Sequence, residues 1–321
     1  MSEILQPFFP YNGGIFATVI LPSRKRPALL CKAIDSIYSL AVNKNHIEFI
    51  VKADSDDQET LDLCEKLRNS INLKVLVTDR EDGYLGMHRW INEIALKHAK
   101  GDWLFLFTDD AIFAGDEYPE VSAQNWDQKL FVTAFDNTAT WHGCPDICSL
   151  ICSTSTRSFS DFIFVRRKVI EILGHYSPIT WTNIYLQAVL CFISSSFRYQ
   201  LGVIHNREND RAEDEDISRK IALLQVNNIE GIELRAKDTK KLISYIEDWR
   251  RKRCAICRKY LTEEYWLPSE TKSYIRLDSG CHHGEFNVCI NCADYNSSRK
   301  ADCPICGLET AIPREELVIT F

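Results

Sequence analysis

Hydrophobic positions follow two alternating patterns from the amino terminus to Phe113. Short, nearly continuous apolar runs are typical of strands that are covered on both faces, and they occupy residues 15–22, 47–52, 73–77 and 103–107. The segments between them repeat apolar residues at intervals of three and four, the period of one buried helix face, at residues 29–41, 58–69 and 87–99. This alternation predicts an α/β fold with a mostly parallel sheet flanked by helices.

A pair of carboxylates stands at the end of the fourth run. Residues 103–107 lead through Thr108 to Asp109 and Asp110, and ligands of parallel sheets bind at the carboxyl ends of the strands. Hard oxygen ligands favour Mg²⁺ or Mn²⁺, which in turn hold phosphate oxygens. The pattern predicts a metal and phosphate site, with a solvated turn as the alternative, because Asp is common where a chain leaves a strand.

The pattern loosens after Phe113, and the composition changes abruptly at Cys254. Further strands are expected at residues 130–135, 162–165 and 198–205, and further helices at 167–173, 183–193 and 236–253. A chain of 321 residues is long enough for more than one domain. We divide it into a first domain, a connecting helix and a cysteine-rich module, at residues 1–225, 226–253 and 254–321.

Composition narrows the function classes. Apolar content of 45% and charged content of 26% are those of a globular protein, and a net charge of −7 gives no strong nucleic-acid signal. The longest mostly apolar stretch, 179–197, contains too many polar residues for a membrane span. The amino terminus lacks the pattern of a secretory signal. Thirteen cysteines, many in paired spacings, fit metal binding in a reducing compartment, so we expect a cytoplasmic protein.

The strand ends carry three polar segments in a fixed order. They are Pro22-Ser23-Arg24-Lys25-Arg26-Pro27, then Asp54-Ser55-Asp56-Asp57, then Thr108-Asp109-Asp110. In this order they resemble the family 2 type glycosyltransferases, which have a Rossmann-like GT-A fold and use nucleotide sugars. The resemblance covers about two thirds of the chain.

The resemblance implies a role for each segment. Asp54 would contact the nucleobase, the loop at Arg24 to Arg26 would lie near the nucleotide, and Asp109 and Asp110 would handle the metal and the diphosphate. His205, at the end of a late strand, resembles a histidine that completes the metal site (Mn²⁺ or Mg²⁺) in several relatives. The residues assigned to the nucleotide-sugar site are Pro22, Ser23, Arg24, Arg26, Asp54, Asp56 and Gly83.

The implied activity is metal-dependent transfer of a sugar from a nucleotide-diphosphate donor to an unidentified hydroxyl acceptor, which could be a glycan, a protein or a small molecule.

Two departures from the family pattern matter. Thr108 stands where the first acid of an Asp-x-Asp motif is common. Asn183 stands where inverting members place an acidic base, and an amide cannot accept a proton from the acceptor. Asp136 and Asp161 are the alternative bases, and loss of catalysis is the other explanation.

The carboxyl-terminal segment carries four pairs of metal-ligating residues, enough for two tetrahedral Zn²⁺ sites. A segment with so few core residues needs such a metal to fold. The order resembles a RING-type finger, in which binding is interleaved. The first zinc would take Cys254, Cys257, Cys289 and Cys292, and the second Cys281, His283, Cys303 and Cys306. His282 is a rival for the histidine position.

The RING resemblance leaves several functions open. Ile256 stands where RING fingers carry the apolar residue that recruits ubiquitin-conjugating enzymes, but Gly307 replaces the arginine after the last ligand. A structural or protein-docking module, a ubiquitin-ligase-like adaptor and an inactive scaffold are the alternatives. A third group, Cys144, Cys148 and Cys152 with His142, could ligate a metal or could simply be small buried residues.

Overall fold

The computed structural model describes the chain over the following residues: 14–80, 85–130, 144, 146–153, 162–180, 182–193, 196–205, 221, 224, 228–251, 274–278, 285–289, 301–302 and 309–310. The chain forms two compact units. The first comprises residues 1–134 and 146–241, and the second comprises residues 135–145 and 242–321.

An eight-stranded mixed sheet forms the centre of the first unit, in the order β3-β2-β1-β4-β7-β6-β8-β5. The parallel half consists of β1 (Ala17–Pro22), β2 (Ile47–Asp54), β3 (Leu73–Thr78) and β4 (Trp103–Leu106). The other half consists of β5 (Ala111–Phe113), β6 (Ser149–Ser153), β7 (Ile163–Arg166) and β8 (Ser196–His205). The expected α/β fold with a mostly parallel core sheet is confirmed, because all four predicted amino-terminal strands pair in parallel.

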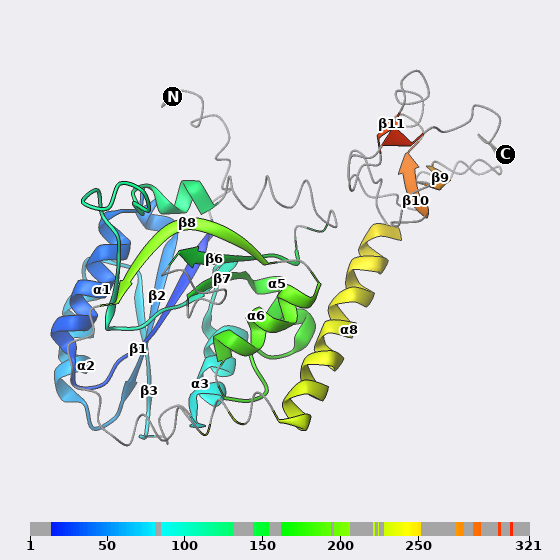
Figure 1. Cartoon of the computed structure of the whole chain (residues 1–321). Helices are drawn as coiled ribbons and strands as arrows, with labels where there is room; N and C mark the ends of the chain where they lie inside the picture. The colour runs from blue at the N-terminus through cyan, green and yellow to red at the C-terminus, as the bar shows by residue number, and fades with distance from the viewer. Residues whose placement is uncertain are drawn as a thin grey trace, which may run out of the picture. The chain divides into compact units, whose positions relative to one another are not determined.

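Helices cover both faces of this sheet (Figure 1). One face carries α1 (Pro27–Ser39) and α2 (Gln58–Leu67), and the other carries α3 (Met87–Glu93), a π-helical turn (Ile94–His98) and α5 (Arg167–Leu173). The remaining helices are α6 (Thr182–Phe192) and α8 (Ile229–Arg251), and a 3₁₀ turn (Lys44–His46) precedes β2. None of the described helices is long and apolar enough to cross a membrane.

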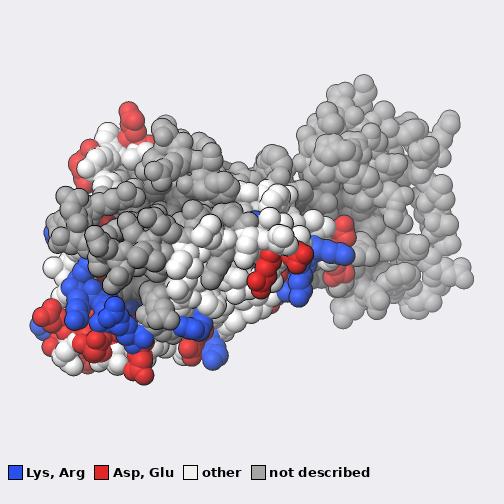
Figure 2. Space-filling view, turned by 60° about the horizontal axis from the view of Figure 1, so that its bottom comes forward, with Lys and Arg blue, Asp and Glu red and all other residues white. Residues whose placement is uncertain are grey.

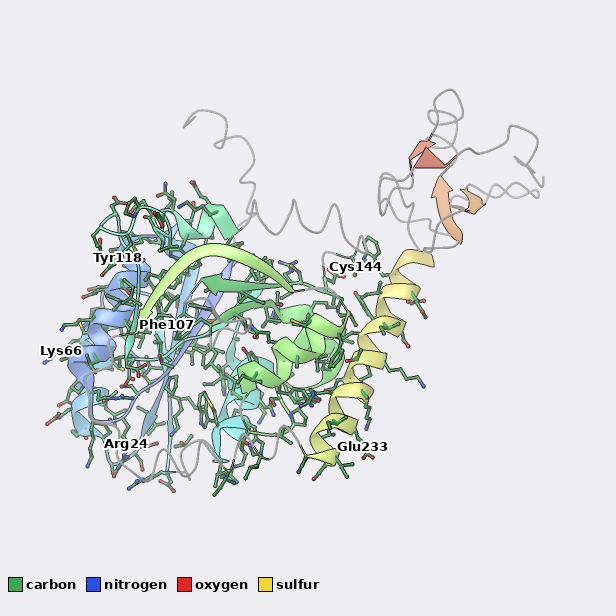
Figure 3. All side chains as sticks on the ribbon, viewed as in Figure 1. Arg24, Lys66, Phe107, Tyr118, Cys144 and Glu233 are labelled. Atoms are coloured by element: carbon green, nitrogen blue, oxygen red, sulfur yellow. The ribbon has the colours of Figure 1, made fainter. Side chains whose placement is uncertain are left out.

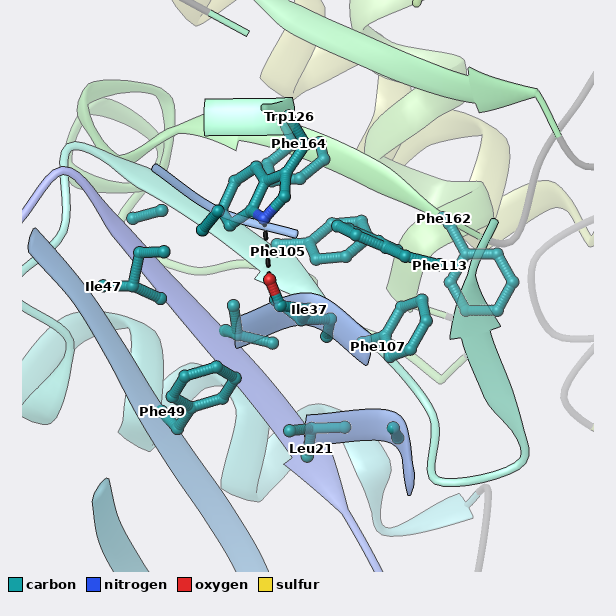
Figure 4. Close-up of a cluster of buried hydrophobic side chains, with 14 of the residues drawn as sticks. Leu21, Ile37, Ile47, Phe49, Phe105, Phe107, Phe113, Trp126, Phe162 and Phe164 are labelled. Carbon is teal, nitrogen blue, oxygen red and sulfur yellow. Dashed lines mark hydrogen bonds between the residues drawn. The ribbon is translucent and has the colours of Figure 1, made fainter. Parts of the chain in front are cut away.

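An aromatic cluster forms the core behind the end of β4 (Figure 4). Phe105 stacks on Phe164 of β7 with ring centroids 3.9 Å apart, and Phe107 meets Phe113 edge to face at 5.5 Å. Trp126 is fully buried and its Nε1 donates a hydrogen bond of 2.9 Å to the Ile37 carbonyl of α1. These contacts hold the chain rigidly on both sides of Thr108 to Asp110.

A buried polar network fixes the opposite, amino-terminal edge of the sheet. Glu48 is fully buried in β2 and accepts hydrogen bonds from Thr18 Oγ1 (2.7 Å) and the Lys100 backbone N–H (2.9 Å). The Lys74 ammonium group pairs with the same carboxylate. Gly101 passes so close to β1 that an added Cβ would lie 2.4 Å from the Thr18 nitrogen. The register of β4, and hence the position of Asp109, depends on this close approach.

Two expectations need correction, and one strand was not expected. The strand expected at 130–135 has only Leu130 among the described residues, and that residue is helical. The helix expected at 236–253 begins earlier and runs over Ile229–Arg251. β6 was not anticipated, because Ser149 to Ser153 mixes serine and cysteine with only a few strand-forming residues.

The described parts of the second unit include two short antiparallel pairings. β9 (Tyr274–Asp278) pairs with β10 (Glu285–Cys289), and β11 (Ala301–Asp302) pairs with β12 (Glu309–Thr310). Of the eight predicted zinc ligands, only the backbone of Cys289 belongs to the described residues. Elsewhere in the described part of the chain, no group of three metal-ligating side chains occurs. The zinc module and the domain boundaries therefore stay predictions.

Candidate functional site

The predicted site residues of the first unit come together at the carboxyl edge of the parallel strands. β2, β1 and β4 are neighbours in that order, so their ends lie side by side. The loop after β1 spans them, because Arg24 contacts the end of β2 and Arg26 contacts the segment after β4. Figure 2, which brings this edge forward, shows basic and acidic side chains gathered next to one another.

Asp109 is a deeply buried acid of this edge, with only 1% of its side chain exposed. Ser23 Oγ donates a hydrogen bond of 2.8 Å to its Oδ2. Arg26 Nη2 lies 2.7 Å from its Oδ1, but no donor among the described residues is aligned with Oδ1 as a hydrogen bond. Burial raises the pKa of Asp109 to about 6, against the opposing effects of Arg26 and Ser23. The contacts with Arg26 and Ser23 therefore do not fully offset the cost of burying the ionised carboxylate, which we call undercompensated.

Such an oxygen is suited to a divalent cation. Mg²⁺ and Mn²⁺ are held by one or two carboxylates together with substrate phosphates, and Asp110 follows Asp109 directly. Thr108 Oγ1 is also buried without a hydrogen-bond partner in the described structure. His205 pairs through its backbone with Ala111, the residue after Asp110. These oxygens are of the kind that could hold a hard metal ion, and Asp109 is a candidate ligand.

A second cluster surrounds Asp54 at the end of β2 and includes Arg24, which is labelled in Figure 3. Arg24 Nη1 lies 2.5 Å from Asp54 Oδ2 and 2.6 Å from Asp56 Oδ1, and its Nη2 lies 2.9 Å from Asp56 Oδ2. The Lys52 ammonium group contacts the other oxygen, Asp54 Oδ1. Arg24 lowers the pKa of Asp56 to about 2, and the two acids raise the pKa of Arg24 above its ordinary value, against the effect of its desolvation.

The loop that carries Arg24 and Arg26 is held by Asp57. The backbone N–H of Lys25 donates to Asp57 Oδ2 at 2.5 Å, and Lys25 has a φ of 54°, which is rare for a residue with a side chain. Asp57 Oδ1 also accepts from the Thr60 N–H at 3.3 Å, so it caps α2. Although burial opposes it, these hydrogen bonds lower the pKa of Asp57. One acid thus joins the loop to the start of a helix.

Sequence reasoning missed Lys52 and Asp57. Lys52 was assigned to the strand without a role, yet a lysine in an otherwise apolar run is a detectable signal, because buried charges need a partner. Asp57 belongs to the predicted acidic segment, and the helix that follows it could have identified it as a cap. Pro22 ends β1 as expected.

Other predicted residues are not tested by the structure. Gly83, Asp136 and Asp161 lie outside the described residues, and of Asn183 and His205 only the backbone is described. Cys148, directly before β6, and Cys152, within it, are both buried, and burial raises the pKa of both thiols. No group of metal-ligating side chains forms there among the described residues.

The segment before α6 is held by a side chain of α3. Asn92 Oδ1 accepts hydrogen bonds from the backbone N–H groups of Tyr176 (2.6 Å) and Ser177 (3.1 Å). Its Nδ2 donates to the Ser177 carbonyl at 2.7 Å. Gly174 begins this turn with a φ of 82° and ends α5. A single amide therefore fixes the turn that leads to Asn183.

Comparison with known proteins agrees with this geometry. Residues 18–130 match the family model of glycosyl transferase family 2. A stretch of 96 residues is 32% identical to the poly(ribitol-phosphate) beta-N-acetylglucosaminyltransferase TarS of two strains of Staphylococcus aureus. That match covers 30% of this chain but only 16% of TarS. The chain therefore contains a segment similar to family 2 glycosyltransferases, and the activity of the whole relative does not transfer with it.

Two solved structures were compared with the first unit. The mannosyltransferase PcManGT from Pyrobaculum calidifontis, in complex with GDP-Man and Mn²⁺, superposes with a TM-score of 0.51 at 15% identity. It covers 66% of this chain, which in turn covers 62% of it. The 1–349 fragment of Staphylococcus aureus TarS, in complex with UDP-GlcNAc, gives a TM-score of 0.45 at 14% identity, over 72% of this chain and 73% of that fragment. The first of these likenesses supports a GT-A-like fold for the first unit.

Proposed function

We propose that the first unit is a metal-dependent glycosyltransferase that takes its sugar from a nucleotide-diphosphate donor. The observation that carries the proposal is Asp109, a buried and undercompensated carboxylate at the carboxyl edge of the sheet, beside Ser23 and Arg26. Support also comes from the family 2 match over residues 18–130 and from relatives whose names specify sugar transfer.

Each group at this edge has a role in the proposed reaction. Asp109 and Asp110, with His205 as a third ligand, would hold Mn²⁺ or Mg²⁺. When bound, the cation offsets the negative charge that develops on the departing nucleoside diphosphate. Arg26, which is 42% exposed at its side chain, can donate to phosphate oxygens in addition to neutralising Asp109. Asp54 and Arg24 would contact the nucleoside, and Ser23 keeps the Asp109 carboxylate in place.

The proposed reaction also needs a group that activates the acceptor. A hydroxyl acceptor needs a positioned base, because a protonated oxygen is a weak nucleophile. Asp136 and Asp161 remain the candidates. The turn held by Asn92 would position the segment next to the acceptor.

For the second unit, we propose a RING-like module that binds two zinc ions and serves folding or partner docking. The paired spacings of its cysteines are the support. The alternative is a ubiquitin-ligase-like adaptor whose glycosyltransferase-like unit recognises a partner. Loss of self-ubiquitination on Ile256→Ala, in a reaction with purified conjugating enzymes, would favour that alternative.

The proposal is tested by donor hydrolysis and thermal shift with a panel of nucleotide sugars, with and without Mn²⁺. We expect one donor to raise the melting temperature only with Mn²⁺ and to be hydrolysed slowly. Asp109→Asn should abolish both effects. Asp62→Asn is a matched control, because Asp62 is an exposed acid on α2 that bonds only one turn away to Gln58. If no nucleotide sugar shifts the wild-type protein, the proposal is wrong.

A further inference from the structure

The two arginines of the loop after β1 reach the ends of different strands. Arg24 Nη1 lies 2.5 Å from Asp54 Oδ2, at the end of β2, and Arg26 Nη2 lies 2.7 Å from Asp109 Oδ1, beyond the end of β4. β2 and β4 flank β1 on opposite sides. In an extended backbone, residues i and i+2 lie on the same side of the chain. The backbone must therefore turn between Arg24 and Arg26.

Lys25 makes this turn. Its φ of 54° lies in the left-handed region, which is unfavourable for a residue with a Cβ atom and is open to glycine without that cost. Lys25 is exposed, so packing of its own side chain does not offset the cost. A contact of its backbone has to hold the turn.

That contact is a hydrogen bond to Asp57. The Lys25 backbone N–H donates to Asp57 Oδ2 at 2.5 Å, and Asp57 is buried. The other oxygen, Oδ1, accepts from the Thr60 N–H at 3.3 Å, where α2 begins. Each oxygen of the carboxylate therefore holds a different backbone segment, and the helix gives the loop a fixed anchor.

Resting on the proposed function, we propose that Asp57 is a positioning residue for the donor site. Its hydrogen bond to Lys25 fixes the turn that sends the two arginines to the ends of β2 and β4. Both guanidinium groups are then in place before a nucleotide binds, so binding does not have to order the loop. Asp57 acts through the loop and contacts no ligand in this role.

Two substitutions separate the loop from the helix. Asp57→Ser keeps a good amino-terminal cap, because one oxygen can still accept from the Thr60 N–H, but the shorter side chain leaves the Lys25 N–H without its partner. Lys25→Gly removes the cost of the left-handed backbone, because glycine adopts a positive φ without a steric penalty. A loop with the second substitution depends less on Asp57.

The test is calorimetric titration of the full chain with a panel of nucleoside diphosphates in the presence of Mn²⁺. Asp57→Ser should weaken binding about tenfold, which is the effect of losing one hydrogen bond to a charged group. In the Lys25→Gly background the same substitution should weaken binding only about twofold, because the turn is no longer strained. Each comparison keeps residue 25 constant, so the lost lysine charge cancels. Asp62→Ser, at an exposed acid of α2, is the matched control and should change nothing.

Hydrogen exchange of the Lys25 amide measures the hydrogen bond without any ligand, by NMR on the full chain labelled at lysine. We expect this amide to be protected in the wild type and in Asp62→Ser, and to exchange about tenfold faster in Asp57→Ser. If Asp57→Ser does not fold, Asp57→Asn takes its place, because asparagine also caps helices but has one acceptor oxygen instead of two.

The results distinguish this inference from the function on which it rests. If a nucleotide binds but the Asp57 variant binds it as tightly as wild type, the positioning role is wrong and the proposed function stands. The same holds if the loss of affinity is equal in both backgrounds, since a residue that only caps α2 would behave in that way. An unprotected Lys25 amide in the wild type also overturns the inference. If no nucleoside diphosphate binds the wild type, the proposed function fails and Asp57 keeps only a structural role.

Discussion

Replacing Asp109 by asparagine is expected to stabilise the protein at neutral pH, although it removes the central residue of the proposed metal site. Burial raises the pKa of Asp109 from 3.8 to about 6. A group whose pKa is higher in the folded state contributes its stability below the unfolded pKa and loses it as pH rises through the folded pKa. The difference between the two pKa values corresponds to about 3 kcal/mol, which the ionised side chain costs at neutral pH.

The pH dependence gives this prediction its sign and size. Wild type loses about 1.4 kcal/mol of these ~3 kcal/mol between pH 5 and pH 7.5, because Asp109 is already ionised at pH 5 in the unfolded chain but ionises in the folded chain only as the pH passes through about 6. The asparagine side chain has no such titration. The free energy of unfolding of Asp109→Asn, relative to wild type, should therefore rise by about that amount between the two pH values.

The measurement is denaturant unfolding at pH 5 and pH 7.5 in buffer without added divalent metal, followed through the fluorescence of buried tryptophans such as Trp126. Asp62→Asn serves as the control and should differ equally from wild type at both pH values, because Asp62 is exposed. If the difference between Asp109→Asn and wild type is the same at pH 5 and pH 7.5, or falls with pH, the assignment of Asp109 as an undercompensated acid is wrong.

Three further predictions concern the core, the turn before α6 and the zinc module. Phe164→Ala should cost about 3–5 kcal/mol of unfolding free energy, because it leaves a cavity beside Phe105 and Trp126; thermal unfolding that is nearly unchanged would contradict the stacked core. Asn92→Ala should lower the transfer rate and cost about 1–3 kcal/mol, because the Ser177 and Tyr176 backbone groups lose their partner; unchanged kcat and stability would exclude a positioning role. Chelation should release about two zinc ions per chain, and atomic absorption that finds none would refute the zinc module.

Much of the parallel half of the fold follows from local pattern. The four strands and the first two helices were predictable because their apolar periods are regular and their ends are marked by proline, glycine or acids. The convergence of Ser23, Asp54 and Asp109 followed from the same pattern, since the carboxyl ends of neighbouring parallel strands must lie together.

The remainder depends on contacts between distant segments. Arg24 pairs with Asp54 and Asp56, which lie 30 and 32 residues further along the chain. This pairing depends on the loop conformation at Lys25, and the hydrophobic pattern of the sequence does not predict that conformation. Asn92 likewise accepts hydrogen bonds from Tyr176 and Ser177, which lie 84 and 85 residues further along the chain. Leu130 was assigned to a strand because it opens an apolar run, but its buried position in the core is reached from a helical segment. Tertiary packing overrides local preference at such positions.

A crystal structure of the full chain with Mn²⁺ and a nucleoside diphosphate, with the metal located by its anomalous scattering, would test the proposed site directly. We expect a manganese peak at the carboxylate of Asp109, next to the diphosphate, with the nucleoside extending toward Asp54. A peak elsewhere, with Asp109 still held only by Ser23 and Arg26, would contradict this expectation.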